Sequence, residues 1–193
     1  NEEKYKGFGV SACATCDGFF YKDKIVAVIG GGNMAVEEAI FLTKFASKVY
    51  LIHRRDELRA EKILQKRLFE NSKIEIIWNK QVTDVLVEDN PLGVTGIQIK
   101  DTLSKELSEV SCSGVFVAIG HSPASDLIKD QLDLFDGGYV ATISGTTKTS
   151  IPGVFAAGDL VDNVYRQAVT SAAMGCMAAL DAEKYLSDID NGN

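Results

Sequence analysis

The chain has 193 residues, of which 46% are hydrophobic and 24% are charged, as is typical of folded globular proteins. Its formal net charge of -7 disfavours nucleic acid and anionic membranes as partners. It has no run of about 18 apolar residues and no secretory signal, so we expect no membrane span and a cytoplasmic location. The chain begins at Asn1 without an initiator methionine, and we expect residues before it in the complete protein.

Strands and helices alternate in the first part of the chain, after an irregular segment expected at residues 1–21. The expected elements are a buried parallel strand over residues 24–30, a helix over 33–46, a strand over 48–52, a charged amphipathic helix over 56–70 and a strand over 73–78. This order predicts an α/β fold, specifically a Rossmann-like domain with a parallel sheet.

The pattern changes after residue 80. Two short alternating runs, 83–87 and 94–100, flank Asn90-Pro91-Leu92-Gly93. Alternation with a turn between the runs predicts an antiparallel β excursion from the parallel sheet. A buried strand is then expected over residues 114–120.

The sequence His121-Ser122-Pro123 breaks this pattern and predicts a domain boundary, with domains at residues 1–120 and 121–193. In the second domain we expect a strand over residues 153–157 and a long helix over residues 166–186.

A dinucleotide-binding motif follows the first buried strand. Gly30, Gly32 and Ala35 fit the spacing G-x-G-x-x-A. Gly30 permits the tight turn, Gly32 allows a pyrophosphate to approach the backbone, and Ala35 allows close packing of helix and strand. The alternative is a glycine-rich turn without a ligand, but the position between a strand and a helix favours cofactor binding, including by Asn33 and Met34 at the helix N-terminus.

Basic residues follow the second strand, where enzymes that use NADH usually carry an acidic residue. This position holds His53, Arg54 and Arg55, and Arg59 is expected one helical turn beyond Arg55. Guanidinium groups bind a phosphate in a bidentate manner, so we predict that these four residues bind the 2′-phosphate of NADPH. The alternative is a solvated, charged start of a helix.

Two cysteines lie three positions apart near the start of the chain. Cys13 and Cys16 can form a small disulfide ring, and Asp17 directly after them can donate and accept protons. A zinc site would need a second ligand pair, and we predict no metal. Cys112 and Cys176 are single and are expected to be buried thiols.

With these motifs the chain resembles low-molecular-weight thioredoxin reductases, which are NADPH-dependent flavoprotein disulfide reductases. The matching blocks are residues 9–18 (GVSACATCDG), 30–32 (GGG), 37–39 (EEA), 53–56 (HRRD), 116–121 (FVAIGH), 151–159 (IPGVFAAGD), 165–168 (YRQA) and 175–180 (GCMAAL). The resemblance implies the C-terminal part of a second Rossmann-like domain, for FAD, at residues 121–193, and it implies that the N-terminal flavin-binding half is lacking here. Met34 stands where the family usually has a small hydroxyl residue.

The resemblance also implies roles for individual residues. Electrons would pass from NADPH through FAD to the Cys13–Cys16 disulfide and on to thioredoxin, and the full-length form would be a homodimer. Cys16 would lie nearest the flavin, Cys13 would attack thioredoxin, and Asp17 would handle protons. Further cofactor-binding residues implied in this way are Ile119, Gly120, Asp159, Arg166, Gln167 and Ala168.

Two alternatives stay open. Without the flavin half, the chain could bind NADPH and be catalytically inert, because a hydride does not efficiently reduce a disulfide without an intermediary. The flavoprotein reductases of alkyl hydroperoxide systems share the layout, but usually have Pro-His between the cysteines. Ala14 and Thr15 favour thioredoxin reductase.

Overall fold

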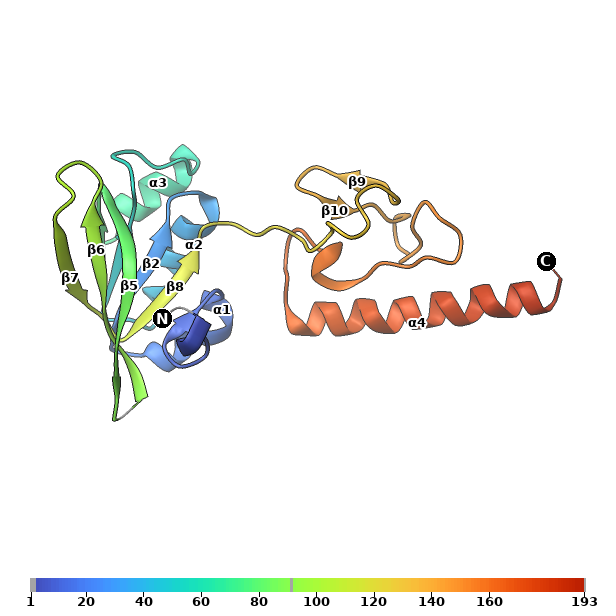
Figure 1. Cartoon of the computed structure of the whole chain (residues 1–193), viewed down its shortest axis with the longest axis horizontal. Coiled ribbons are helices and arrows are strands. Elements are labelled where there is room, and N and C mark those ends of the chain that lie inside the picture. Colours follow the sequence, from blue (N-terminus) through green and yellow to red (C-terminus); the bar gives the residue numbers. More distant parts are fainter. Residues whose placement is uncertain (1–2, 91, 193) are drawn as a thin grey trace. The chain divides into compact units, whose positions relative to one another are not determined.

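The computed structural model describes residues 3–90 and 92–192 (Figure 1). The chain divides into two compact units, residues 1–120 and 121–193, and each is described by itself. In the described part of the chain, no helix combines the length and apolarity needed to cross a lipid bilayer.

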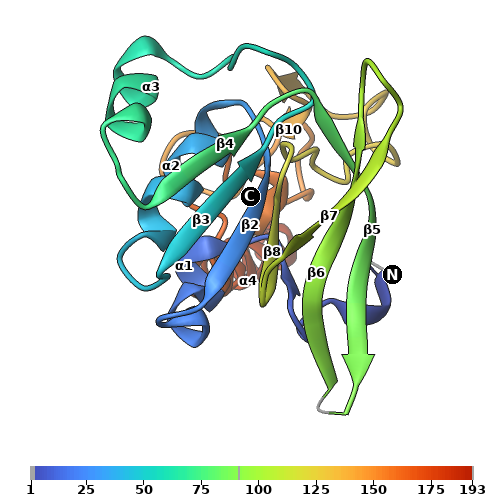
Figure 2. The same cartoon turned by 90° about the vertical axis from the view of Figure 1, so that its left-hand side faces the viewer.

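The first unit is built on a parallel sheet of five strands, visible in Figure 2. In spatial order the strands are β1 (Val10–Ser11), β8 (Gly114–Ala118), β2 (Ile25–Gly30), β3 (Lys48–Ile52) and β4 (Ile74–Ile77). The predicted parallel sheet is therefore confirmed. β1 lies in the segment that was expected to be irregular, and its pairing with β8 attaches that segment to the sheet.

Helices cover one face of this sheet and a second sheet covers the other. The helices are α1 (Ala14–Asp17), α2 (Asn33–Leu42) and α3 (Lys62–Phe69), with 3-10 turns at Glu3–Tyr5 and Gly18–Tyr21. The second sheet is antiparallel, with β5 (Lys80–Asp89), β6 (Leu92–Asp101) and β7 (Leu107–Ser111). This confirms the predicted antiparallel excursion, although Pro91 of its connecting turn lies outside the described residues.

Alternation along each strand explains the two hydrophobic cores of this unit. Val28 and Phe116 point to the helix layer, whereas Ala27 and Val115, one position away, point to the antiparallel sheet. Successive side chains of a strand point to opposite faces, so a strand covered on both faces must be apolar throughout. Complete burial of side chains such as Val28, Val115 and Phe116 contributes about 1.5–3 kcal/mol each, so the two cores stabilise this unit.

Two predicted helices are too long at one end. The helix expected over residues 33–46 ends at Leu42, where the Thr43 hydroxyl donates to the Ile40 carbonyl and the chain turns. The helix expected from residue 56 begins at Lys62, because residues 53–61 are held by contacts to the glycine motif rather than by helical hydrogen bonds. These contacts are long-range and do not follow from helical periodicity.

The second unit has less regular structure. It contains β9 (Leu134–Phe135) paired with β10 (Tyr139–Val140), a 3-10 turn at Gly158–Leu160 and the long helix α4 (Ala168–Asp190). The prediction of a strand over residues 153–157 is wrong, because within the described residues Phe155 forms an isolated bridge to Lys148. A strand needs a neighbour along its length to satisfy its backbone groups, and among the described residues these pair with a neighbour only around that one bridge.

Candidate functional site

The glycine turn, residues 30–32, connects β2 to α2 at the carboxyl edge of the parallel sheet. Gly30 has a φ of +155°, and a Cβ atom there would overlap the Ala118 carbonyl oxygen and lie 2.6 Å from the Ala35 Cβ. Ala35 itself is fully buried in the helix-side core. The close helix–strand packing predicted for Ala35 is therefore present, and Ala118 on β8 adds to it.

His53 lies beneath the glycine turn and is buried. Its Nδ1 lies 2.9 Å from the Gly30 carbonyl oxygen, and its Nε2 lies 2.9 Å from the Glu57 carbonyl oxygen. A Cβ atom at Gly31 would overlap the His53 ring. The middle glycine, which the motif leaves free to vary, is thus required by the imidazole beneath it.

Three residue pairs join the glycine turn and Asn33, the first residue of α2, to residues 53–61, which we call the arginine loop. Besides the His53 contact, the Arg59 N–H donates to the Gly31 carbonyl at 2.8 Å. The Glu61 N–H donates to Asn33 Oδ1 at 2.8 Å, and Asn33 Nδ2 donates back to the Glu61 carboxylate at 3.3 Å. These contacts hold both ends of the arginine loop next to the glycine turn and the start of α2.

A cavity of about 820 Å³ opens over this junction. Arg54 and Arg59 line it, whereas Arg55 is exposed outside its lining. The expectation that Arg55 and Arg59 lie one helical turn apart is wrong, because residues 53–61 form a loop, and this loop places Arg59 at the cavity. The predicted cofactor-binding residues that line the cavity are Gly30, Gly32, Asn33, Met34, His53, Arg54, Arg59, Ile119 and Gly120.

Residues from β5 form a further wall of the cavity that the sequence analysis did not identify. Lys80 to Val85 line it, and Lys80 Nζ is paired with Asp101 Oδ2 at 2.6 Å. The hydrogen bond from Lys80, with those from the Ser104 and Leu103 N–H groups, holds the pKa of Asp101 well below its ordinary value. The sequence contained one indication of this wall, because β5 begins at the carboxyl edge of the parallel sheet, where α/β proteins bind ligands.

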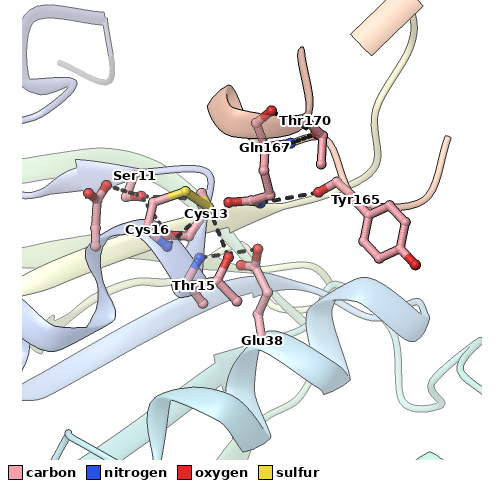
Figure 3. Close-up of a disulfide and its surroundings, with 10 residues drawn as sticks. Ser11, Cys13, Thr15, Cys16, Glu38, Tyr165, Gln167 and Thr170 are labelled. Carbon is pink, nitrogen blue, oxygen red and sulfur yellow. Dashed lines mark hydrogen bonds between the residues drawn. A yellow bond between two sulfur atoms is a disulfide. The ribbon is translucent and has the colours of Figure 1, made fainter. Parts of the chain in front are cut away.

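The redox turn, residues 13–17, contains the disulfide between Cys13 and Cys16 (Figure 3). Cys13 is the N-cap of α1, and its Sγ accepts a hydrogen bond from the Cys16 N–H at 3.2 Å. The Thr15 hydroxyl lies 3.2 Å from the same sulfur. The predicted small ring between the two cysteines is therefore present.

Asp17 is anchored to the same turn by its backbone and its side chain. Its N–H donates to the Cys13 carbonyl at 3.1 Å, and its Oδ2 accepts a hydrogen bond from the Ser11 hydroxyl at 2.6 Å. Burial raises the pKa of Tyr21, and the nearby negative charge of Asp17 raises it further. Ser11 was not among the predicted site residues.

Glu38 connects the redox turn to α2. The Ala14 N–H donates to Glu38 Oε1 at 3.4 Å, and Figure 3 shows this side chain reaching from α2 towards the disulfide. Because α2 begins at the glycine turn, one helix contacts the redox turn with its middle and the candidate cofactor cavity with its N-terminus.

The predicted flavin-contacting residues all lie in the second unit. Asp159 Oδ1 accepts a hydrogen bond from the Ser171 hydroxyl at 2.9 Å, and Gln167 is the N-cap of α4, directly before Ala168. Arg166 has a φ of +50° and donates through Nη1 to the Tyr139 hydroxyl at 3.4 Å. This unit has its own cavity of about 600 Å³, and none of these four predicted residues lines it.

Asp162 fixes the backbone ahead of α4. Its carboxylate accepts hydrogen bonds from the N–H groups of Val164, Tyr165 and Arg166 at 2.8–2.9 Å. Burial alone would raise the pKa of Asp162, but these hydrogen bonds outweigh it and lower that pKa. They hold Arg166 in its left-handed conformation, a role that the sequence analysis did not assign.

The two remaining cysteines differ from each other. Cys112 is buried, and burial raises the pKa of its thiol to about 11. Cys176 is exposed on α4, so the expectation of a buried thiol is wrong there. α4 carries no buried residue. The helical spacing of its small residues suggested a packed helix and gave no sign of this exposure. Over the described ranges, no group of three His, Cys, Asp or Glu side chains could hold a metal ion.

A glycine turn in a dinucleotide-binding position and a redox turn within one unit define a class of pyridine-nucleotide-dependent disulfide reductases. The sequence profile of the family described as pyridine nucleotide-disulphide oxidoreductase matches residues 1–175. The chain therefore belongs to this family.

Within the family, the chain is similar to proteins named thioredoxin reductase. It is 57% identical to the thioredoxin reductase of Rickettsia conorii and 54% identical to that of Escherichia coli O157:H7, over 97% and 98% of its own length. The crystal structure of thioredoxin reductase from Streptococcus pyogenes is 40% identical over 97% of the chain, with a TM-score of 0.90. The chain spans 60% of the length of each of these proteins.

Proposed function

We propose that this chain is the NADPH-binding and disulfide-carrying part of a thioredoxin-disulfide reductase. The observation that carries the proposal is the cavity that unites the glycine turn with Arg54 and Arg59, in the same unit as the Cys13–Cys16 disulfide. The names of the relatives support thioredoxin as the partner.

The geometry of the glycine turn supports dinucleotide binding. Gly32 is the N-cap of α2, no side chain caps it, and a Cβ atom there would meet no atom within 4 Å. The first N–H groups of a helix have no partner within the helix and carry partial positive charge, which suits a pyrophosphate. The open space at Gly32 leaves room for that group to approach the backbone.

The arginine loop supports NADPH over NADH. Arg54 and Arg59 line the same cavity as Gly32, so both can reach the 2′-phosphate of a dinucleotide held at the glycine turn. Both ring nitrogens of His53 already lie near backbone carbonyls, so we propose that His53 positions the loop. We assign Arg55, outside the cavity lining, a lesser role than the sequence suggested.

We propose that residues 1–120 form the NADPH domain and that residues 121–193 are the C-terminal part of an FAD domain, in a protein that is a homodimer when full-length. FAD, when bound, supplies the two-electron carrier that couples a hydride donor to a disulfide. Asp159, Arg166, Gln167 and Ala168 are proposed to contact it. Asp162 would keep Arg166 in place through its backbone hydrogen bonds.

The surroundings of the disulfide suit exchange with a protein. Cys13 is proposed to attack the thioredoxin disulfide, Cys16 to lie nearest the flavin and Asp17 to move protons. Phe19 and Phe20, directly after the redox turn, are 67% and 71% exposed. Exposed neighbouring aromatic side chains are typical of protein-docking surfaces, which supports a protein as the substrate.

The NADPH assignment is tested by calorimetric titration of the chain with NADPH and NADH. Arg54→Ala and Arg59→Ala are each expected to weaken NADPH binding by about ten- to a hundredfold, since a charge-assisted hydrogen bond contributes about 1.5–3 kcal/mol. NADH binding should change little. Arg55→Ala is the matched control and should keep the NADPH affinity within about threefold, as is usual for surface substitutions.

Equal affinity of the unsubstituted chain for NADPH and NADH would contradict the 2′-phosphate assignment. A visible absorption spectrum with added FAD tests the catalytic part of the proposal. A flavin band that NADPH bleaches supports a working reductase, whereas NADPH binding without retained flavin supports an NADPH-binding fragment that is inert on its own.

A further inference from the structure

Ser11 forms a closed ring of hydrogen bonds with the redox turn. Its Oγ accepts the Cys13 N–H at 3.1 Å and donates to Asp17 Oδ2 at 2.6 Å. The Asp17 N–H donates to the Cys13 carbonyl at 3.1 Å and completes the ring. In Figure 3, Ser11 lies next to the disulfide.

The position of Ser11 is fixed by the sheet rather than by the redox turn. Ser11 is 7% exposed, lies on β1 and pairs in parallel register with Phe116 of β8. Asp17 is half-buried on α1, and its side chain reaches the sheet through its hydrogen bond with Ser11. Ser11 therefore connects a carboxyl group in a short helix to the parallel sheet.

A second possible acceptor makes Ser11 suited to a carboxyl group that changes its protonation state. The Ser11 Oγ also lies 3.4 Å from the Cys13 carbonyl oxygen. When Asp17 is charged, the hydroxyl donates to it. When Asp17 is protonated, its O–H can donate to Ser11 Oγ while the hydroxyl turns to the Cys13 carbonyl. A hydroxyl can donate and accept, so the Ser11 hydroxyl keeps a donor and an acceptor partner in either state.

We propose that Ser11 is a positioning residue that orients Asp17 for proton transfer at the Cys13–Cys16 pair and adapts to both of its protonation states. The inference rests on the proposed redox role of that pair. When a nucleophile attacks one sulfur, the S–S bond breaks and its electron pair leaves on the other sulfur as a thiolate. The proton of Asp17 passes to that thiolate, and Asp17 recovers a proton from water.

The test uses the full chain and a water-soluble phosphine, so it needs neither NADPH nor flavin. The phosphine attacks one sulfur, the other leaves as a thiolate, and water converts the adduct into phosphine oxide and the second thiol. The rate of reduction is followed by alkylation and mass spectrometry of the peptide that contains Cys13 and Cys16. At each pH, this rate is divided by the rate at which the phosphine reduces oxidised glutathione. The ratio removes the effect of phosphine protonation, which slows both reactions equally.

For the unsubstituted chain we expect this relative rate to fall as pH rises, because the protonated carboxyl is the donor. In Ser11→Ala the fall should lie at higher pH, since the charged carboxylate loses the hydrogen bond from the hydroxyl. Ser11→Thr keeps the hydroxyl and should restore the original profile. Asp17→Asn should abolish the fall, and the double variant should match Asp17→Asn.

Ser125→Ala is the control, since Ser125 has the same 7% exposure but lies in the second unit. A Ser11→Ala profile lowered equally at every pH would overturn the proposal and leave Ser11 a structural residue. A fall that persists in Asp17→Asn would overturn it as well. These reduction rates can be measured even if the chain does not bind NADPH. The proposal for Ser11 and the proposed NADPH binding can therefore fail independently of each other.

Discussion

Two nearly identical pentapeptides adopt different structures in the two units. Gly114-Val-Phe-Val-Ala118 is the strand β8, whereas Gly153-Val-Phe-Ala-Ala157 contains one isolated bridge. Val115 is fully buried, but Val154 is 38% exposed. β8 lies between β1 and β2, and the second pentapeptide has no comparable neighbours among the described residues. An apolar run thus predicts a strand only where other strands complete its hydrogen bonds.

The helices of the two units show the same contrast. α2 buries Ala35, Val36, Ala39 and Leu42 completely, whereas α4 has no buried residue along its 23 positions. The second unit has a small core formed by Leu132, Val140 and Ala156. Its elements therefore depend more on polar contacts, such as the hydrogen bonds of Asp162 and Asp181. The first unit should be the more stable, and the following predictions test this difference.

The largest expected effect is a difference in the reactivity of the two single cysteines. Cys176 is exposed, whereas Cys112 is buried with a pKa raised to about 11, and only the thiolate reacts. We expect native Cys176 to be alkylated about a thousandfold faster than Cys112, because Cys112 must also wait for the first unit to open. Mass spectrometry of alkylated peptides over time measures both rates.

In denaturant the two cysteines should react at similar rates, which is the internal control. Comparable rates under native conditions would contradict the view that the first unit has a closed core. They would show that Cys112, directly after β7, is reached by the reagent without opening of the first unit.

The next effect concerns the glycine turn. Gly30→Ala places a methyl group against the Ala118 carbonyl and the Ala35 side chain in a backbone with φ of +155°. We expect a loss of at least about 3 kcal/mol in the free energy of unfolding of the first unit, as for overpacking combined with backbone strain. Urea denaturation followed by the fluorescence of Trp78 measures it, since Trp78 packs in this unit and is the chain's single tryptophan.

Gly32→Ala is the matched control, since its added methyl group meets no atom within 4 Å and its φ of -93° is open to alanine. It should leave the free energy of unfolding nearly unchanged and weaken NADPH binding by blocking the approach to the backbone. Equal destabilisation by both substitutions would refute the packing argument. Unchanged NADPH binding in Gly32→Ala would count against a pyrophosphate at the glycine turn.

The sequence was most informative where burial follows from local pattern. The strands expected over residues 24–30, 48–52 and 73–78 lie within one residue of β2, β3 and β4 at each end. β2 and β3 carry buried side chains on both faces, so their apolar runs end where burial ends, whereas the edge strand β4 is only partly buried and has Glu75 exposed. The glycine motif was identified for the same reason, because the turn lies directly between a buried strand and a helix.

Long-range contacts account for what the sequence did not predict. Periodicity predicts that the helix extends back to residue 56, but hydrogen bonds from Arg59 to Gly31 and from Glu61 to Asn33 hold that segment as a loop. The same contacts bring Arg59 into the cavity and leave Arg55 outside it. Ser11 was missed because its partner Asp17 is recognised only once β1 and α1 are seen together.

The smallest expected effect lies in the second unit, where a polar contact attaches α4. Thr147 is 1% exposed, and its N–H and hydroxyl both donate to Asp181 Oδ2, at 2.9 and 2.8 Å. Thr147→Val removes the hydroxyl at nearly constant shape and should lower the equilibrium constant for keeping α4 docked by about tenfold. Hydrogen exchange of α4 backbone amides measures this, and Thr142→Val is the control for the same chemical change.

The effect of Thr147→Val should depend on pH in a defined direction. The hydrogen bonds from the Thr147 N–H and hydroxyl lower the pKa of Asp181. A carboxyl group whose pKa is lowered by folding stabilises the fold above its unfolded pKa of about 3.9, and this contribution is lost as pH falls through the folded pKa. The difference between Thr147→Val and the unsubstituted chain should therefore be full near neutral pH and shrink in acid. A difference that stays constant down to acid pH would mean that packing of the Thr147 side chain, rather than the Asp181 carboxylate, attaches α4. The second unit would then depend on apolar contacts as the first does, in spite of its small core.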